Sequence, residues 1–279
     1  MNTNKVWFVT GASKGMGLSL VKKLIECGYR VAATSRRSQR LINAVGYFDG
    51  QQFLPLEIDL TSEESISEAF EKTASHFGKI DVLVNNAGYG IGGAVEELNQ
   101  KEIKDSFDIN VMAVIKTMQS VMPYFRKQRS GNIVNISSIA GFAPGVGWAM
   151  YAATKYAITG LSEVMAEDVK EFGVKVTVVA PGAFRTEFLE DSSLVFAENK
   201  IDGYNKIRAS HEKYAAMNGV QIGNPEKLAQ VFIDLAENPN PPVRLYIGSD
   251  AYHRAAEKIN LLSEELESNR AISYSTDFK

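Results

Sequence analysis

The sequence predicts an α/β fold in which a parallel sheet of about seven strands has helices on both faces. Short runs of β-branched and aliphatic residues alternate with longer stretches whose apolar residues recur every three or four positions. This alternation is typical of parallel sheets, because neighbouring parallel strands are usually joined by a helix. A chain of 279 residues, of which 45% are hydrophobic, can also fill one large core. We therefore expect a single domain over residues 1–279.

The predicted elements follow one another in a regular order. The strands are Val6–Thr10, Arg30–Ser35, Phe53–Ile58, Val82–Asn85, Asn132–Ile136, Lys175–Ala180 and Arg244–Ile247. The helices are Met16–Cys27, Glu63–Phe77, Lys101–Arg129, Tyr151–Phe172, Pro225–Glu237 and Ala251–Glu267. Thr61 is expected to be the N-cap of the second helix, because Glu64 completes a capping box three residues later.

Two segments depart from this order. Residues 187–222 interrupt the alternation and mix aromatic side chains with many charges, so we expect a mobile lid over a binding site. Residues 251–279 form an extension that begins as an amphipathic helix, with Ile259, Leu262 and Leu266 on one stripe. This stripe either packs on the same chain or forms an oligomer contact.

Composition and charge exclude several classes of protein. The net charge is −3, from 30 basic and 33 acidic residues, so no charge signature of nucleic-acid binding is present. Residues 130–154 lack charges, but their polar residues and glycines fit a membrane span badly. Cys27 is the only cysteine, which fits a reducing compartment, and three scattered histidines predict no metal site. We expect a cytoplasmic protein.

Three glycines occur in the turn after the first strand. In the run GASKGMG at 11–17, glycine allows a tight turn and lets the backbone approach a pyrophosphate at the N-terminus of the next helix. The candidate dinucleotide contacts in this turn are Gly11, Ser13, Lys14, Gly15, Met16 and Gly17.

The same run also matches the G-x-S-x-G nucleophile elbow of hydrolases. In that interpretation Ser13 would attack an ester, with His211 or His253 as the base. An elbow needs preceding structure that forms an oxyanion hole, however, and only one strand precedes Ser13. The hydrolase is therefore the weaker alternative.

Six motifs in order along the chain resemble those of the short-chain dehydrogenase/reductase family. They are TGASKGMG at 10–17, NNAG at 85–88, Asn110 in FDINVMA, ISS at 136–138, YAATK at 151–155 and PGAFRT at 181–186. The match covers about residues 5–185 and implies a Rossmann-like, doubly wound sheet. The C-terminal ending resembles the hydroxysteroid-dehydrogenase-like or retinol-dehydrogenase-like branch of the family.

The resemblance implies that Asn110, Ser138, Tyr151 and Lys155 are the catalytic residues. Reducing a carbonyl requires a proton on oxygen, and Tyr151 would be the general acid and base. The Lys155 cation, an oxidised nicotinamide and the helix N-terminus would lower the pKa of this phenol from its ordinary value of about 10. Ser138, preferred over Ser137, would donate to the carbonyl oxygen. Asn110 would anchor a water joined to Lys155.

The resemblance also assigns residues around a bound dinucleotide. Asp59 would bind the adenine amino group, and Leu60 would contact the adenine surface. The remaining contacts would come from Asn85, Asn86, Ala87, Gly88, Pro181, Gly182 and Thr186, together with Tyr151 and Lys155. For Asn85 an alternative stays open, since such an asparagine can instead brace the sheet.

The end of the second strand favours NADP(H) over NAD(H). NAD-binding proteins of this architecture usually have an acid there, but residues 27–48 contain no Asp or Glu. Arg36 is favoured as the contact to a 2′-phosphate, because a planar guanidinium matches that group. Arg37 would stack on adenine or assist, Lys14 would add a second cation, and Ser35 could donate a neutral hydrogen bond.

The resemblance thus implies an NADP(H)-dependent oxidoreductase that interconverts an alcohol and a ketone or aldehyde. We expect a fairly apolar small-molecule substrate, no membrane or nucleic-acid partner, and a homodimer or homotetramer. The expected pocket walls are Tyr89, Ile91, Val95, Phe142 and Trp148. Besides the hydrolase, a non-enzymatic dinucleotide-binding sensor on the same fold is the alternative.

Overall fold

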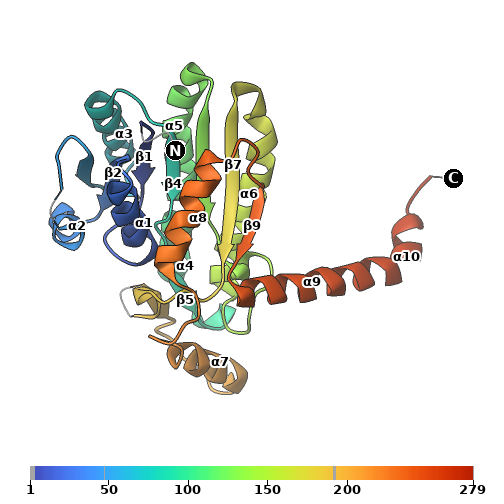
Figure 1. Cartoon of the computed structure of the whole chain (residues 1–279). Coiled ribbons are helices and arrows are strands. Elements are labelled where there is room, and N and C mark those ends of the chain that lie inside the picture. The colour runs from blue at the N-terminus through green and yellow to red at the C-terminus, as the bar shows by residue number, and fades with distance from the viewer. Residues whose placement is uncertain (1–3, 47, 191–192, 279) are drawn as a thin grey trace.

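A parallel sheet of seven strands forms the centre of the computed structural model, which describes residues 4–46, 48–190 and 193–278 (Figure 1). The strand order is β3-β2-β1-β4-β6-β7-β9, and all neighbours are parallel. The bounds are β1 Val6–Val9, β2 Arg30–Ser35, β3 Phe53–Glu57, β4 Val82–Asn85, β6 Gly131–Ile136, β7 Val174–Pro181 and β9 Arg244–Ile247. The predicted α/β fold is confirmed.

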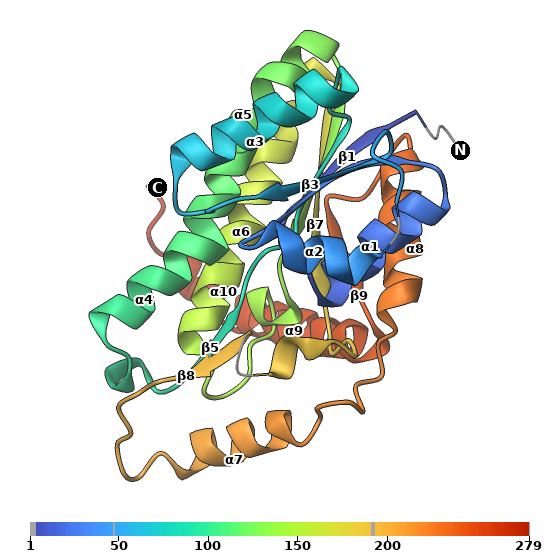
Figure 2. The same cartoon turned by 90° about the vertical axis from the view of Figure 1, so that its left-hand side faces the viewer.

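Helices cover both faces of the sheet (Figure 2). One layer contains α1 (Gly15–Glu26), α2 (Ser38–Val45) and α8 (Pro225–Glu237), and the other contains α3 (Glu63–Phe77), α4 (Gln100–Phe107), α5 (Ala113–Gln128) and α6 (Ala149–Asp168). Successive strand residues point to opposite faces. In β1, Val6 and Phe8 therefore pack toward α3 and α5, whereas Trp7 and Val9 pack toward α1 and α8.

The strand order determines where a ligand can bind. The chain builds β1, β2 and β3 in one direction and then places β4, β6, β7 and β9 on the other side of β1. The order reverses between β1 and β4, and in such sheets ligands bind in the crevice at the carboxyl ends of these strands. The glycine turn follows β1 and the NNAG motif follows β4, so both motifs lie at this crevice.

Two predictions of local structure are wrong. The helix predicted over Lys101–Arg129 is divided by a π-helical turn at Asp108–Met112, a feature that is frequent at functional sites. The N-cap of α3 is Ser62 rather than Thr61, because the Ser62 hydroxyl accepts a hydrogen bond from the amide of Ser65 (3.2 Å).

Further elements lie outside the main sheet. A short strand after β4, β5 (Gly90–Gly92), pairs in parallel with β8 (Leu194–Phe196), which belongs to the predicted lid. The lid also contains α7 (Asn205–Ala215), and it crosses the molecule below the crevice in Figure 2. Single 3-10 turns occur at Val95–Glu97, Ile139–Gly141, Lys170–Phe172 and Glu187–Leu189. The C-terminal extension consists of α9 (Ser249–Ser268) and α10 (Arg270–Tyr274).

The charge-free segment 130–154 lies within the fold. It contains β6, the following 3-10 turn and the start of α6, so its apolar residues contribute to the core, and Ser137 and Tyr151 from this segment line the crevice. In the described ranges, none of the helices is both long enough and apolar enough to cross a bilayer.

Candidate active site

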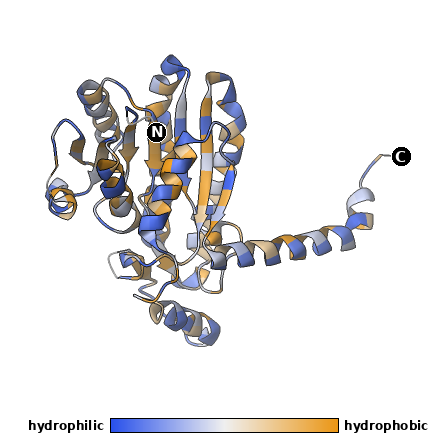
Figure 3. Ribbon diagram, viewed as in Figure 1, coloured by the Kyte–Doolittle hydropathy of each residue, from blue (hydrophilic) through white to orange (hydrophobic). Residues whose placement is uncertain are grey.

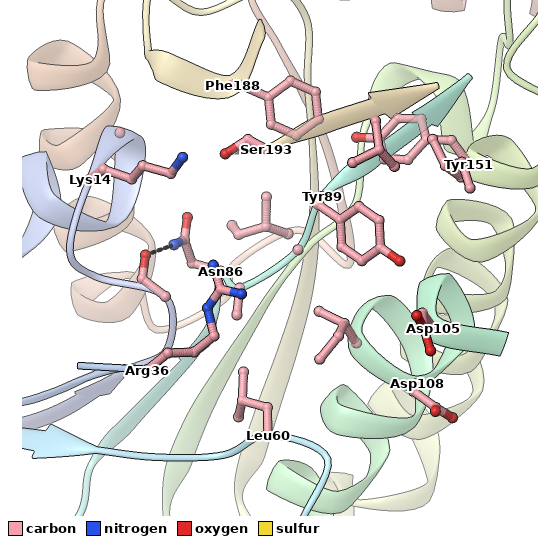
Figure 4. A pocket seen from close by; sticks show the side chains of 18 of the residues that line it. Lys14, Arg36, Leu60, Asn86, Tyr89, Asp105, Asp108, Tyr151, Phe188 and Ser193 are labelled. Atoms are coloured by element: carbon pink, nitrogen blue, oxygen red, sulfur yellow. Dashed lines mark hydrogen bonds between the residues drawn. The ribbon is translucent and has the colours of Figure 1, made fainter. Parts of the chain in front are cut away.

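A cavity of about 900 Å³ lies at the crevice between β1 and β4. It extends from the glycine turn to Tyr151, which lie on opposite sides of the view in Figure 4. The predicted site residues that line it are Gly11, Ser13, Lys14, Gly15, Met16, Ser35, Arg36, Asp59, Leu60, Asn86, Ala87, Gly88, Tyr151, Lys155 and Thr186. The sequence motifs therefore meet around one space.

Glycine is required at two positions of the turn after β1. Gly11 has a φ of +63°, and a Cβ there would lie 2.7 Å from the Cα of Ala87. A Cβ at Gly17 would lie 2.5 Å from the Nδ2 of Asn86. Gly17 does not line the cavity; its small size allows α1 to pack closely against the NNAG loop.

Asn86 joins the two loops that form the floor of the cavity. Its Nδ2 donates to the carbonyl oxygens of Thr10 (3.0 Å) and Gly11 (2.9 Å). The Thr10 hydroxyl accepts hydrogen bonds from the amides of Asn86 (3.0 Å) and Ala87 (3.1 Å). These bonds hold the glycine turn against the end of β4.

Asn85 does not face the cavity. Its Nδ2 donates to the side chain of Asn135 (2.9 Å), and its Oδ1 accepts from the Thr117 hydroxyl (2.7 Å). The side chain is 3% exposed and joins β4 to β6 and α5. This geometry favours the alternative in which Asn85 braces the sheet, because both ends of its amide are already used inside the protein.

Pro181 and Gly182 also lie outside the cavity lining. The amide of Gly182 donates to the carbonyl of Ile247 (2.9 Å), which extends the pairing of β7 with β9. The amide of Ala183 donates to Asp250 Oδ2 (2.8 Å). These bonds tie the PGAFRT loop to the start of α9.

Ser138, Tyr151 and Lys155 lie together at the end of β6 and the start of α6. The Ser138 hydroxyl lies close enough to that of Tyr151 to lower its pKa, and the Lys155 ammonium lies 5.7 Å from the centre of the Tyr151 ring. Lys155 Nζ is fixed by a hydrogen bond to the carbonyl of Ile136 (3.0 Å). Tyr151 and Lys155 face the same side because they are four residues apart on a helix.

The two neighbouring serines make different contacts. The hydroxyl of Ser137 donates to the carbonyl of Lys155 (3.0 Å), beneath α6. The hydroxyl of Ser138 accepts from the amide of Ala140 (3.1 Å) and lowers the pKa of the neighbouring Tyr151. Ser137 lines the cavity and Ser138 does not, but the Ser137 hydroxyl is already bonded inside the protein and Ser138 is the serine that acts on Tyr151.

Burial dominates the titration of these groups. It raises the pKa of Tyr151 to about 12, against the lowering effect of the hydrogen bond from Ser138. Burial also lowers the pKa of Lys155 to about 8. Both shifts have the same cause, since a low-dielectric site disfavours phenolate and ammonium alike. A lowered pKa of Tyr151, as expected from the sequence, therefore requires positive charge beyond that of this chain.

Asn110 lies in the π-helical turn, close to Lys155. Its Oδ1 accepts from the amide of Tyr89 (3.0 Å), and its Nδ2 donates to the carbonyl of Tyr89 (2.9 Å). A Cβ on Gly88 would lie 3.0 Å from Asn110 Oδ1 and 3.4 Å from Lys155 Nζ. Gly88 therefore leaves open the space between these two polar atoms.

Two cationic side chains, Lys14 and Arg36, line the cavity near the glycine turn (Figure 4). Arg37 is exposed and does not line it. The Ser35 hydroxyl donates to the carbonyl of Arg37 (2.6 Å) and accepts from its amide (3.1 Å). Ser35 thus shapes the start of α2, and Arg36 is the guanidinium of the pair that faces the cavity.

Glu187 is a cavity residue that the sequence did not single out. Its Oε2 accepts a hydrogen bond from the amide of Gly15 (3.0 Å), the first residue of α1. A carboxylate therefore occupies the position that anions favour at a helix N-terminus. Glu187 and Glu190 oppose the lowering of the Lys14 pKa that burial causes.

At the adenine side predicted from the sequence, Asp59 and Leu60 line the cavity after β3. Asp59 Oδ1 accepts from the hydroxyl (2.7 Å) and the amide (2.9 Å) of Thr61. These hydrogen bonds lower the pKa of Asp59, so its carboxylate is ionised at neutral pH. Leu60 supplies an apolar surface beside it.

The lid closes the other side of the cavity. Phe188 packs near Tyr151, with ring centres 6.1 Å apart, and Phe196 in β8 also lines the cavity. Glu97, which is 1% exposed, forms an ion pair with Arg208 of α7 and accepts from the amide of Ile201 (2.8 Å). These contacts attach the lid to the loop after β5.

Three of the expected pocket walls are wrong. Tyr89 and Ile91 line the cavity, but Val95 is 60% exposed and does not. Phe142 packs against Tyr246 near α9. Trp148 does not line the cavity; it packs among the aromatic rings of the lid.

The hydrolase interpretation of the glycine turn finds no support in the geometry. Ser13 lines the cavity, but His211 lies in α7, bonds to the carbonyl of Gly147 (3.0 Å) and packs against Trp148. His253 lies in α9. In the described part of the chain, neither histidine is a hydrogen-bond partner of Ser13.

Comparisons with known proteins agree with this geometry. A family profile described as short chain dehydrogenase matches residues 5–194. An oxidoreductase of Botryotinia fuckeliana is 33% identical over 270 residues, which cover 96% of this chain and 98% of that protein. A 3-ketodihydrosphingosine reductase of Bacteroides thetaiotaomicron is 33% identical over 244 residues, 88% of each protein.

A solved structure shows the same similarity in three dimensions. The crystal structure of a short-chain dehydrogenase from Streptomyces avermitilis matches with a TM-score of 0.91 at 33% identity, and it covers 98% of this chain and 99% of that chain. These comparisons identify a family but no branch within it. The hydroxysteroid-dehydrogenase-like or retinol-dehydrogenase-like branch stays a prediction.

Proposed function

Because the chain belongs to the short-chain dehydrogenase/reductase family, we propose that it is an NADP(H)-dependent oxidoreductase that interconverts an alcohol and a ketone or aldehyde. The observation that supports this most directly is that Tyr151 and the buried Lys155 line the cavity that begins at the glycine turn, with the Ser138 hydroxyl acting on Tyr151 from beside it. Together these residues supply a proton donor, a partner for a developing oxyanion and a cation.

The residues of the cavity fit a dinucleotide with a 2′-phosphate. A negative group is already accepted at the N-terminus of α1, where Glu187 bonds to Gly15, so this position suits a pyrophosphate. Lys14 and Arg36 supply the positive charge that a further phosphate needs, and Leu60 supplies an apolar surface for a base. When bound, the reduced cofactor supplies hydride for carbonyl reduction.

The chain's own residues would move the proton. In reduction, the Tyr151 hydroxyl donates its proton to the carbonyl oxygen, and in oxidation the phenolate accepts it. Ser138 donates a second hydrogen bond to that oxygen; the amide of Ala140 bonds to the Ser138 oxygen and so leaves its proton available. Lys155 stabilises the phenolate by its positive charge, and Asn110 positions the loop beside Lys155 and would hold a water there.

The substrate would be a fairly apolar small molecule. The lining near Tyr151 includes Tyr89, Ile91, Phe188, Val195 and Phe196, and apolar walls with few polar groups favour such ligands. The similar protein from Bacteroides thetaiotaomicron is a reductase of 3-ketodihydrosphingosine, which agrees with carbonyl reduction as the reaction class.

A substrate panel tests the proposed reaction. NADPH consumption is followed by fluorescence with ketones, aldehydes and quinones of increasing apolar size. We expect at least one apolar carbonyl compound to be reduced. NADPH binding without turnover of any carbonyl compound would instead support the dinucleotide sensor.

We expect Glu187→Gln to tighten NADPH binding by about fivefold, the factor that corresponds to about 1 kcal/mol. The substitution keeps an acceptor for Gly15 but removes a negative charge that competes with the cofactor phosphates. Equilibrium binding by NADPH fluorescence measures the effect. Glu198→Gln is the matched control, since Glu198 also lines the cavity but its backbone bonds to Glu102. Unchanged or weaker NADPH binding in Glu187→Gln would contradict this role.

The lid is expected to respond to ligands. The segment from Thr186 to Ile222 interrupts the strand–helix order, and Gly203 and Gly219 supply flexible points with positive φ. Its amide hydrogens should exchange quickly in the free protein and slowly once cofactor and substrate are bound. Hydrogen exchange with mass spectrometry measures this, and equally strong protection in both states would rule out a mobile lid.

The proposal also covers the domain organisation, the oligomeric state and the location of the protein. The whole chain, residues 1–279, would form one catalytic domain, with residues 187–222 as the lid and residues 251–279 as the C-terminal extension. We further propose a homo-oligomer in the cytoplasm, on the basis of the single cysteine and the unpaired stripe of the extension.

A further inference from the structure

The C-terminal extension leaves the body of the protein as a single projecting arm (Figure 1). Only the start of α9 is packed: Ala251 and Ala255 are the buried residues of this helix, and they contact Ile139 and Phe142. Isolated helices of this length are marginal in water, and helices in proteins are stabilised chiefly by packing of an apolar face. We therefore expect the apolar face of the arm beyond Ala255 to be buried against another surface.

An apolar stripe continues along the arm past the edge of the body. Ile259 is 53% exposed, Leu262 40% and Leu266 73%. Together with Ala255 they follow a spacing of four, three and four residues, which is the heptad pattern of a helix that pairs with another helix. From its sequence, this stripe could pack on the same chain or form an oligomer contact. The structure excludes the first, since the same chain does not bury these residues.

The charges beside the stripe favour pairing with an antiparallel copy of the same helix. Lys258 and Glu265 occupy equivalent positions, each one residue before the stripe residues Ile259 and Leu266. When Ile259 of one copy packs against Leu262 of another in antiparallel orientation, Lys258 lies next to Glu265 of the other copy, and the same pair forms again by symmetry.

The charges of α9 also disfavour a lipid surface as the binding partner of this apolar stripe. Helices that lie on membranes are rich in Lys and Arg on their polar face. The projecting half of α9 instead has Glu264, Glu265 and Glu267, and Figure 3 shows its hydrophilic residues alternating with apolar ones along the whole arm.

We propose that α9 is an interface through which two copies of this chain pair in antiparallel orientation, with Ile259, Leu262 and Leu266 at the centre. In this arrangement the end of each arm reaches the start of the other copy's α9. The exposed Ile272, Tyr274 and Phe278 then meet Tyr252 and the end of β9, which explains why apolar residues continue to the end of the arm.

The oligomeric mass of the full chain tests this interface. Sedimentation equilibrium across micromolar concentrations should show an even-numbered assembly, and Leu262→Glu should halve its mass by raising the dissociation constant at least ~10-fold. Asn260→Glu is the matched control, because it adds the same charge to an exposed position off the stripe. Its mass should equal that of the unsubstituted protein. A monomeric unsubstituted protein, or a mass unaffected by Leu262→Glu, would overturn the proposal.

A charge exchange tests the orientation. Lys258→Glu should weaken the assembly, and adding Glu265→Lys should restore it, because both antiparallel ion pairs are rebuilt in reverse. In a parallel pair Glu265 would lie near Arg270 of the other copy, so the double variant would not recover, which would overturn the antiparallel arrangement. Co-sedimentation of a monomeric protein with neutral or anionic lipid vesicles, abolished by Leu262→Glu, would overturn the proposal in favour of a membrane contact. None of these readouts depends on catalysis, so a failure here would leave the proposed reaction untouched.

Discussion

Tyr151→Phe is expected to lower turnover by at least ~10²-fold while NADPH binding and folding survive, since the usual contribution of a general acid is of this size. The substitution removes only the hydroxyl, whose pKa Ser138 lowers. The ring keeps its packing against Phe188 and its place beside Lys155. Single-turnover measurement of carbonyl reduction isolates the chemical step from product release.

Tyr156→Phe is the matched control for this experiment. Tyr156 lies on the same helix, is 43% exposed and bonds to the carbonyl of Phe142 outside the cavity. Its loss should leave turnover nearly unchanged. If Tyr151→Phe kept more than about a tenth of the original turnover with chemistry rate-limiting, Tyr151 would not be the proton donor.

NADPH is expected to be preferred over NADH by roughly 10²-fold in kcat/KM, since charge-assisted contacts to a phosphate contribute about 1.5–3 kcal/mol each. Arg36 and Lys14 line the cavity and supply such contacts. Glu57, the nearby acid at the end of β3, already accepts hydrogen bonds from the amide (3.0 Å) and the hydroxyl (3.2 Å) of Ser38. We therefore do not expect it to bind the adenine ribose of NADH. Arg36→Ala should raise the KM for NADPH and leave that for NADH nearly unchanged.

Arg37→Ala should have a smaller effect than Arg36→Ala, because Arg37 does not line the cavity. Steady-state kinetics with each cofactor and a fixed carbonyl substrate measures both variants. A kcat/KM with NADH equal to or above that with NADPH would overturn the assignment of the cofactor.

The sheet could be predicted from the sequence because its strands are buried on both faces. Runs such as Val6–Val9 and residues 82–84 are continuously apolar, so the pattern is visible without knowing their neighbours. The motif residues could be placed at one crevice for a related reason. They follow β1, β4, β6 and β7, and in a doubly wound sheet the carboxyl ends of these strands lie at one edge.

The π-helical turn at Asp108–Met112 could not be predicted from local sequence. The sequence of this segment is compatible with a continuous helix. The π-helical turn, with its extra residue, instead coincides with a contact to a distant part of the chain. Asn110 there is bonded on both sides of its amide to the backbone of Tyr89. The pairing of β5 with β8 was missed for the same reason, because each strand has only three residues.

The direction in which a side chain points could not be predicted from the sequence either. Asn85 and Asn86 are adjacent, yet the first points into the sheet and the second holds the glycine turn. The resemblance placed both around a cofactor, and only the structure separates them. The contact of Glu187 with Gly15 is similar, since it joins residues 172 positions apart through a loop whose course the sequence does not determine.

We propose that this chain transfers hydride from a nicotinamide cofactor to a carbonyl carbon. The most direct test uses NADPH that carries deuterium at the reactive carbon of the nicotinamide, with a carbonyl compound that the substrate panel identifies. Mass spectrometry of the product should find the deuterium on the new alcohol carbon, and its formation should fall with Tyr151→Phe. Product that forms without deuterium, or at the same rate in Tyr151→Phe, would contradict this account.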